Sequence, residues 1–174
     1  MTKHMTWPAR IARLDQNGRK RLRLNAEREA KEADPKRAAE AEAALAALDD
    51  SANAEREMDR AVANGPLFER VKRAFERIPP SEKERKLVQA VLDRPGSSSA
   101  ALSRRIGYGN MAWQLHFGIM CRERSAILGP PASLLGSGEP FWSGLLCHVD
   151  EHSSFSLKPE AEAAFRQLGF RTSR

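Results

Sequence analysis

The sequence predicts a mainly α-helical fold with one small β-hairpin near its end. Residues 8–64 consist almost entirely of residues that favour helices. Ser81 and Glu84 form a capping box, a pattern that marks the start of a helix. Only residues 141–149 and 154–157 are β-tolerant: the first run is apolar, the second alternates polar and apolar residues, and a polar loop separates them.

The first predicted segment is a helical arm over residues 1–64, with a basic part followed by an acidic part. Pro8 suits the first turn of a helix, and Gly18 interrupts a pattern that has few apolar positions. Asp34-Pro35 begins a new helix, which Asp49-Asp50-Ser51 is expected to break. We expect an arm with little core, either coiled-coil-like or partly disordered. It would become ordered on nucleic acid, on a protein partner or on itself.

A connecting amphipathic helix is predicted over residues 65–80. Asn64-Gly65-Pro66 is a strong stop signal, and Pro79-Pro80 ends the segment. Between these signals, apolar residues recur at helical spacing at Leu67, Val71, Phe75 and Ile78. Residues 81–174 would then form the main domain.

The order of elements from residue 81 to about residue 128 is typical of a helix-turn-helix. The capped helix ends near Asp93–Gly96, and Ser97–Ser99 provides the cap of a short helix. Gly107-Tyr108-Gly109 turns the chain where a positive φ is expected, and Asn110 begins a longer helix. A tri-helical arrangement of this kind would place the longer helix as the recognition helix.

The predicted hairpin follows this helix-turn-helix and is closed by a further helix. Its two strands lie within residues 141–149 and 154–157, and Asp150–Ser153 forms the loop. Pro159 stands in the first turn of the closing helix, which ends at Gly169. A hairpin in this position corresponds to a wing.

The region from residue 81 to residue 170 therefore resembles winged helix-turn-helix DNA-binding domains. More narrowly, it is similar to a module associated with bacterial HNH-type restriction endonucleases and related defence proteins. The motifs that carry this resemblance are Ile106-Gly107-Tyr108, Gln114-Leu115-His116-Phe117-Gly118, Cys121-Arg122-Glu123-Arg124 and Lys158-Pro159-Glu160-Ala161. The resemblance implies DNA binding. It does not imply nuclease activity, because no HNH-type metal cluster matches and the four histidines are scattered.

The distribution of charge also favours a nucleic-acid partner. The chain carries a formal net charge of +6. Residues 1–40 carry +5 and residues 81–130 carry +4, whereas the segment between them is mildly acidic. Two basic blocks of this kind are suited to a polyanion, so we expect DNA as the partner and no membrane.

Six residues are the candidate nucleic-acid-binding residues. Arg104, Arg105, Arg122 and Arg124 would contact phosphates, and Asn110 and Gln114 would contact bases. For Arg104 and Arg105 the alternative is a solvated helix face, and for Asn110 it is an N-cap. We expect Trp113 and Phe117 to be core residues because apolar residues occur on two sides of their helix.

The sequence indicates no catalytic site, metal site or cofactor. His116 and Cys121 are five residues apart, which points their side chains in different directions on a helix. Cys121 and Cys147 lie among apolar neighbours and are expected to be buried thiols. Without an apolar run of membrane-spanning length or a signal sequence, we expect a cytoplasmic protein. The alternatives to DNA binding are a protein–protein adaptor and an enzyme subunit with an unrecognised site.

Overall fold

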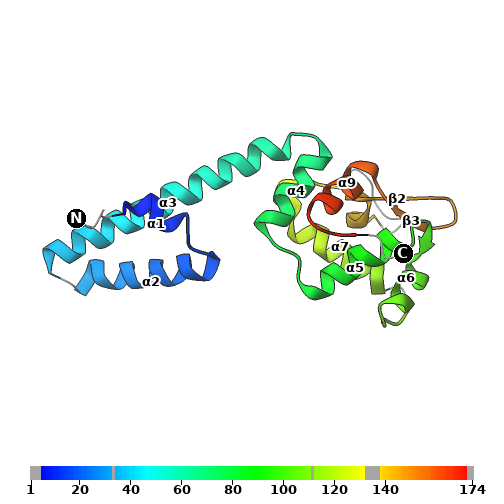
Figure 1. Ribbon diagram of the computed structural model, residues 1–174, viewed down its shortest axis with the longest axis horizontal. Helices are drawn as coiled ribbons and strands as arrows, with labels where there is room; N and C mark the ends of the chain where they lie inside the picture. The colour runs from blue at the N-terminus through cyan, green and yellow to red at the C-terminus, as the bar shows by residue number, and fades with distance from the viewer. Residues whose placement is uncertain (1–4, 33, 111, 132–137, 172–174) are drawn as a thin grey trace. The chain divides into compact units, whose positions relative to one another are not determined.

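The computed structural model describes residues 5–32, 34–110, 112–131 and 138–171 (Figure 1). The chain is mainly α-helical with a small antiparallel sheet, as the sequence predicts. It divides into two compact units, Met1–Met58 and Asp59–Arg174. The division falls inside a helix, α3 (Pro35–Ala63), and not at the expected boundary near residue 64. In the described part of the chain, no helix is both long and apolar enough to span a membrane.

The first unit is a helical hairpin with a narrow core. It contains α1 (Trp7–Ile11), α2 (Gln16–Glu32) and the greater part of α3. Ala26 of α2 packs with Ala41 and Ala44 of α3, and the larger side chains of Ile11 and Leu48 are also buried. Ion pairs between Arg19 and Glu55 and between Arg23 and Asp49 add cross-links between the two antiparallel helices.

The expected helix break at Asp49-Asp50-Ser51 is wrong, because α3 is continuous through these residues. Asp49 points its carboxylate at Arg23 of α2, 2.6 Å from Nη2, and Ser51 is half-buried. Tertiary contacts therefore outweigh the weak helix propensity of this tripeptide. Pro35 begins α3 as predicted, and the Asp34 carboxylate accepts from the N–H groups of Lys36 and Arg37.

The second unit buries one continuous hydrophobic core. Its helices are α4 (Leu67–Arg77), α5 (Glu82–Asp93), α6 (Ser99–Arg105), α7 (Ala112–Glu123), α8 (Ser125–Leu128) and α9 (Pro159–Gln167). Trp113, Phe117 and Phe165 are fully buried, which confirms the predicted core role of the first two. Helix α4, expected to be a connector, contributes Val71, Ala74 and Phe75 to this core and packs against α9. It belongs to the second unit.

A three-stranded antiparallel sheet completes the second unit. Strands β2 (Cys147–Val149) and β3 (Ser154–Leu157) form the predicted hairpin, which projects beside the helices in Figure 1. The short strand β1 (Ser97–Ser98) pairs with the other side of β3, so the strand order is β1-β3-β2. The sequence does not predict β1: it has two residues, and their polar side chains show no alternation.

Local signals set the helix starts. The Ser81 hydroxyl accepts from the Glu84 N–H, and the Glu84 carboxylate accepts from the Ser81 N–H, which confirms the capping box. Ser98 caps α6, and Gly107 has the positive φ of 76° that the predicted turn requires. Pro159 occupies the first turn of α9.

Two expected boundaries differ from the structure. The long helix expected to reach about Leu128 ends at Glu123, and the single turn α8 follows it. The apolar run expected to form one strand over residues 141–149 begins with a 3-10 helix, η1 (Trp142–Leu145), and only its last three residues join the sheet. In η1 the side chain of Ser143 is buried and bonded to α7.

Candidate nucleic-acid interface

Three arginines line a hollow beside α6. The hollow measures about 550 Å³, and its lining consists of Arg94, Ser97, Ala101, Leu102, Arg104 and Arg105. Arg94 ends α5, whereas Arg104 and Arg105 stand in the last turn of α6. The fold therefore brings together guanidinium groups from two helices that a turn and the short strand β1 separate in the chain. Guanidinium groups bind phosphate oxygens through charge-assisted, often bidentate hydrogen bonds.

The three arginines differ in what neutralises them. Arg105 Nη2 lies 3.0 Å from Asp93 Oδ2, and the Asp93 side chain is only 5% exposed. Arg94 and Arg104 are exposed and form no ion pair with any residue that the structure describes. The hollow therefore presents two uncompensated positive charges, with Arg105 held at its edge by a carboxylate.

Two other predicted residues, Gln114 and Arg122, line a different hollow. This groove of about 510 Å³ is lined by residues of α7 and by residues 139–143. Its walls are largely apolar, because Leu115 and Ile119 of α7 line it together with Phe141 and Trp142. The side chain of Leu115 is 63% exposed. Gln114 is half-buried and Arg122 is exposed, so the fold leaves both able to meet a ligand.

Buried serines of α6 fix α7 in place. The Ser103 hydroxyl donates to the Ser99 carbonyl at 2.8 Å and accepts from the Trp113 N–H at 2.9 Å. The Ser99 hydroxyl accepts from the Gln114 N–H at 3.2 Å. The first N–H groups of a helix have no partner within it. Since α6 supplies acceptors for these two, they are not available to an external anion.

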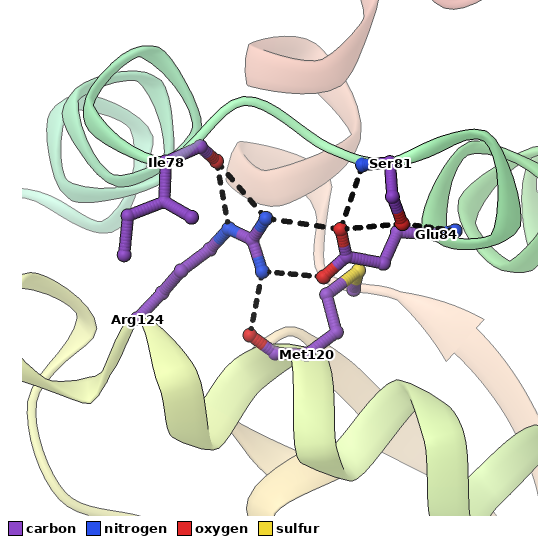
Figure 2. Close-up of polar contacts among 5 residues, drawn as sticks. All are labelled: Ile78, Ser81, Glu84, Met120 and Arg124. Carbon is purple, nitrogen blue, oxygen red and sulfur yellow. Dashed lines mark hydrogen bonds and ion pairs between the residues drawn. The ribbon is translucent and has the colours of Figure 1, made fainter. Parts of the chain in front are cut away.

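The expectation that Arg124 contacts a phosphate is wrong. Its side chain is 1% exposed, and Figure 2 shows its guanidinium enclosed by protein acceptors. Nη1 and Nη2 donate to the two carboxylate oxygens of Glu84 at 2.7 and 3.2 Å. The carbonyls of Ile78 and Met120 accept its other hydrogen bonds. Arg124 is therefore a structural residue and not part of a surface.

The same network holds Glu84 in its charged form. Partial burial would raise the pKa of the carboxyl, but the hydrogen bond from Arg124 and the bonds from Ser81 outweigh that effect. The pKa of Glu84 is lowered from its ordinary value of 4.5. One carboxylate thus serves both the capping box of α5 and the ion pair with Arg124, which lies between α7 and α8.

Asn110 lies in the turn before α7 and does not cap that helix. It is exposed, has the left-handed φ of 51°, and precedes the first helical residue by two positions. An N-cap residue adopts an extended conformation instead. Met111, the residue between Asn110 and Ala112, lies outside the described residues. Tyr108 of the same turn packs on the ring of His116 at 5.3 Å between centroids.

The hairpin loop is negatively charged. Asp150 and Glu151 are exposed, and the Asp150 carboxylate accepts from the N–H groups of Ser154 and His152 at 2.8 and 3.0 Å. These bonds, that of Ser154 first, lower the pKa of Asp150. The loop therefore keeps a negative charge next to any polyanion that approaches it.

Other reactive groups of the second unit are inaccessible or dispersed. Cys121 and Cys147 are buried free thiols, and burial raises the pKa of both. Within the described ranges, no group of three His, Cys, Asp or Glu side chains is placed to hold a metal ion.

The structure thus divides the six predicted residues among four places. Arg104 and Arg105 share the arginine hollow, Gln114 and Arg122 share the α7 groove, Asn110 lies in a turn, and Arg124 is buried. Sequence reasoning missed Arg94, which belongs to the same basic block but stands in a helix stop signal. In the sequence, the one feature that marks Arg94 as a candidate is its positive charge. Its position beside Arg104 depends on the packing of α5 against α6.

Comparison with known proteins adds no relative to this description. No protein-family model, curated protein or solved structure matches the chain.

Proposed function

We propose that the second unit is a winged helix-turn-helix-like domain that binds duplex DNA. The arginine hollow formed by Arg94, Arg104 and Arg105 carries this proposal, because two of its three charges lack a carboxylate partner among the described residues. Phosphate oxygens of a nucleic-acid backbone are the ligands that such a hollow suits best.

The order of elements supports the same function. Helix α5, strand β1, helices α6 and α7, and the hairpin β2–β3 follow one another, with β1 and β2 on either side of β3. A winged helix-turn-helix has this order, and its second and third helices approach the DNA. The arginine hollow lies along α6, which would cross the backbone. The side of α7 that carries Gln114 and Arg122 would then face the base edges.

The mechanism is mainly electrostatic. Arg94 and Arg104 would bind phosphates, and Arg105 would add donors that its ion pair with Asp93 leaves free. Contacts of this kind position the protein on the duplex without reading its sequence. Each phosphate neutralised contributes about 0.9 to the slope of log affinity against log salt concentration.

The test is fluorescence anisotropy of a labelled DNA duplex titrated with the full chain over a range of salt concentrations. An Arg94→Gln/Arg104→Gln variant removes the two unpaired charges and leaves the Arg105–Asp93 pair intact. We expect binding to weaken at least about tenfold at low salt, and the salt slope to fall in magnitude by about 2.

The matched control is Lys83→Gln/Arg85→Gln, because neither cation forms an ion pair with any residue that the structure describes. It removes two charges from the exposed face of α5, near the end opposite to Arg94. We expect the control to bind like the wild type. Equal weakening in both variants would mean that total charge and not the hollow determines binding, and would contradict the proposal.

A second candidate function is protein binding through the α7 groove. The observation that favours it is the exposed Leu115, which lines the groove together with Phe141 and Trp142, so that an apolar side chain of a peptide could fill the groove. The acidic hairpin loop is also less suited to DNA than a basic wing would be. If the wild type does not bind duplex DNA even at low salt, this adaptor function replaces the first.

A further inference from the structure

Helix α2 of the first unit separates its positive charges onto two sides. On the side that faces α3, Arg19 lies 2.7 Å from Glu55 and Arg23 lies 2.6 Å from Asp49. Both arginines are therefore neutralised within the hairpin. Ala26, in the middle of the same side, is 4% exposed, which confirms that this is the packed side of α2.

The opposite side of α2 holds four cations that are not neutralised in this way. Lys20, Leu24 and Lys31 are four and seven residues apart and lie along one line of the helix. Arg21 and Arg28 are seven residues apart and form a second line beside it. We call these five residues the outer face of α2. All five are exposed, and the four cations form no ion pair with any residue in the described ranges.

The outer face of α2 has the character of a polyanion-binding surface. Between Lys20 and Lys31, Glu27 is the one carboxylate on this side, so this stretch of the helix carries four cations against one carboxylate. From Lys20 to Lys31 the helix rises about 16 Å, at about 1.5 Å per residue. A DNA duplex presents about one phosphate charge per 1.7 Å of its axis, so several phosphates lie within reach of this length.

The apolar content of this face argues against the other macromolecules that a basic helix can bind. Leu24 is its single apolar residue, whereas a helix that lies in a membrane surface needs a broad apolar stripe. A self-associating coiled coil needs apolar residues repeated at every a and d position, and this face lacks them. Charge without apolar surface favours the nucleic-acid backbone.

We propose that the outer face of α2 is a second contact surface for the phosphate backbone of nucleic acid. The inference rests on the proposed function for the identity of the ligand, but different residues in a different unit carry it. The contacts would be independent of base sequence, because lysine and arginine side chains on a helix surface would meet only phosphate oxygens. The full chain would then bind through two separate sets of cations.

The experiment compares two variants of the full chain in the same anisotropy titration. Lys20→Gln/Arg28→Gln removes two charges from the outer face of α2. Lys36→Gln/Arg56→Gln removes two exposed charges from α3 and is the matched control. Glutamine favours helices about as well as lysine and arginine, so circular dichroism should show unchanged helix content in both. We expect the α2 variant to bind more weakly, with a salt slope smaller in magnitude by about 2, and the control to match the wild type.

The outcomes separate this inference from the proposed function. If the α2 variant binds like the wild type while the Arg94→Gln/Arg104→Gln variant weakens, the inference is overturned and the proposed function stands. If only the α2 variant weakens, the inference stands and the role of the arginine hollow fails. Two further results would overturn the inference if the α2 variant kept its DNA affinity. Loss of binding of this variant to phosphatidylserine vesicles would indicate a membrane partner, and loss of its self-association in light scattering would indicate a second copy of the chain.

Discussion

The guanidinium of Arg124 joins three segments of the second unit. It bonds the carbonyl of Ile78 after α4, the carboxylate of Glu84 in the first turn of α5, and the carbonyl of Met120 in α7. The ring of Phe75 lies 4.4 Å from its central carbon. A buried cation is tolerable only where its hydrogen bonds are satisfied, and here each nitrogen has an acceptor.

Replacing Arg124 is expected to destabilise the protein strongly. Arg124→Met removes the cation and leaves the Glu84 carboxylate and two carbonyls without their partner. Breaking a buried pair in this way costs about 3–5 kcal/mol of unfolding free energy. Urea unfolding would measure the loss, with Arg122→Met, a change at an exposed neighbour, as the control that stays within about 0.5 kcal/mol. Equal stability of the two variants would contradict the structural role.

The lowered pKa of Glu84 predicts an acid-dependent loss of stability. The folded protein holds the Glu84 carboxyl in its charged form below its ordinary pKa of 4.5. Above that pH the carboxylate is charged in the folded and unfolded states, and its full contribution is present. As the pH falls below 4.5 the unfolded state takes up the proton first, so the contribution declines until the pH passes the folded pKa.

Comparison with Glu84→Gln isolates this effect. Other carboxyls, such as Asp150, titrate in both proteins, so the difference in unfolding free energy between wild type and variant reports on Glu84 alone. We expect this difference to be constant from pH 7 to about pH 5.5 and to shrink below about pH 4.5. A difference that does not change with pH across this range would show that the Glu84–Arg124 contact does not depend on the charge of the carboxyl.

At the scale of elements, the sequence predicts best where the signal is local. The capping box at Ser81, the proline in the first turn of α9 and the glycine turn at Gly107 each depend on the backbone preference of a few neighbouring residues. The order of helices after residue 81 and the β2–β3 hairpin could be predicted for the same reason. These features define most of the fold of the second unit.

Elements determined by distant contacts were not predicted. Strand β1 exists because β3 supplies its hydrogen-bonding partner, which lies 58 residues later in the chain at the Ser97–Phe155 pair. The residues of η1 read as a strand because they are apolar, but the hydrogen bond from Ser143 to the carbonyl of Gln114 holds them against α7. Helix α3 continues through residues 49–51, where Leu48 is buried and Asp49 forms an exposed ion pair with Arg23 of α2.

At the scale of the whole molecule, charge alone could locate the basic blocks but not the candidate site within them. Arg104 and Arg124 belong to the same block, yet one is exposed and the other is buried. Packing decides which arginines keep their charge for a ligand. The same principle applies to α2. Arg19 and Arg23 lie on the side that faces α3 and are paired with its carboxylates, whereas Lys20 and Arg28 lie on the exposed side and are unpaired among the described residues.

The hairpin loop provides a test of how the second unit would face DNA. Glu151 is 86% exposed and stands in the loop between β2 and β3, at the tip of the hairpin. If the loop approaches the duplex as a wing does, its negative charge opposes binding, and Glu151→Gln should raise affinity about two- to fivefold at low salt. High salt should abolish this gain, because the repulsion between exposed charges is screened.

The control for this change is Glu160→Gln, which removes one exposed carboxylate from the first turn of α9. Anisotropy titrations of both variants would separate local repulsion at the loop from a general change in net charge. Equal gains in the two variants would indicate that only net charge matters. A gain confined to Glu151→Gln would place the loop near the phosphates, and would mean that the acidic loop limits affinity while the arginines supply it. Such a balance would suit a protein that must release DNA as well as bind it, since weaker electrostatic attraction shortens the lifetime of non-specific complexes.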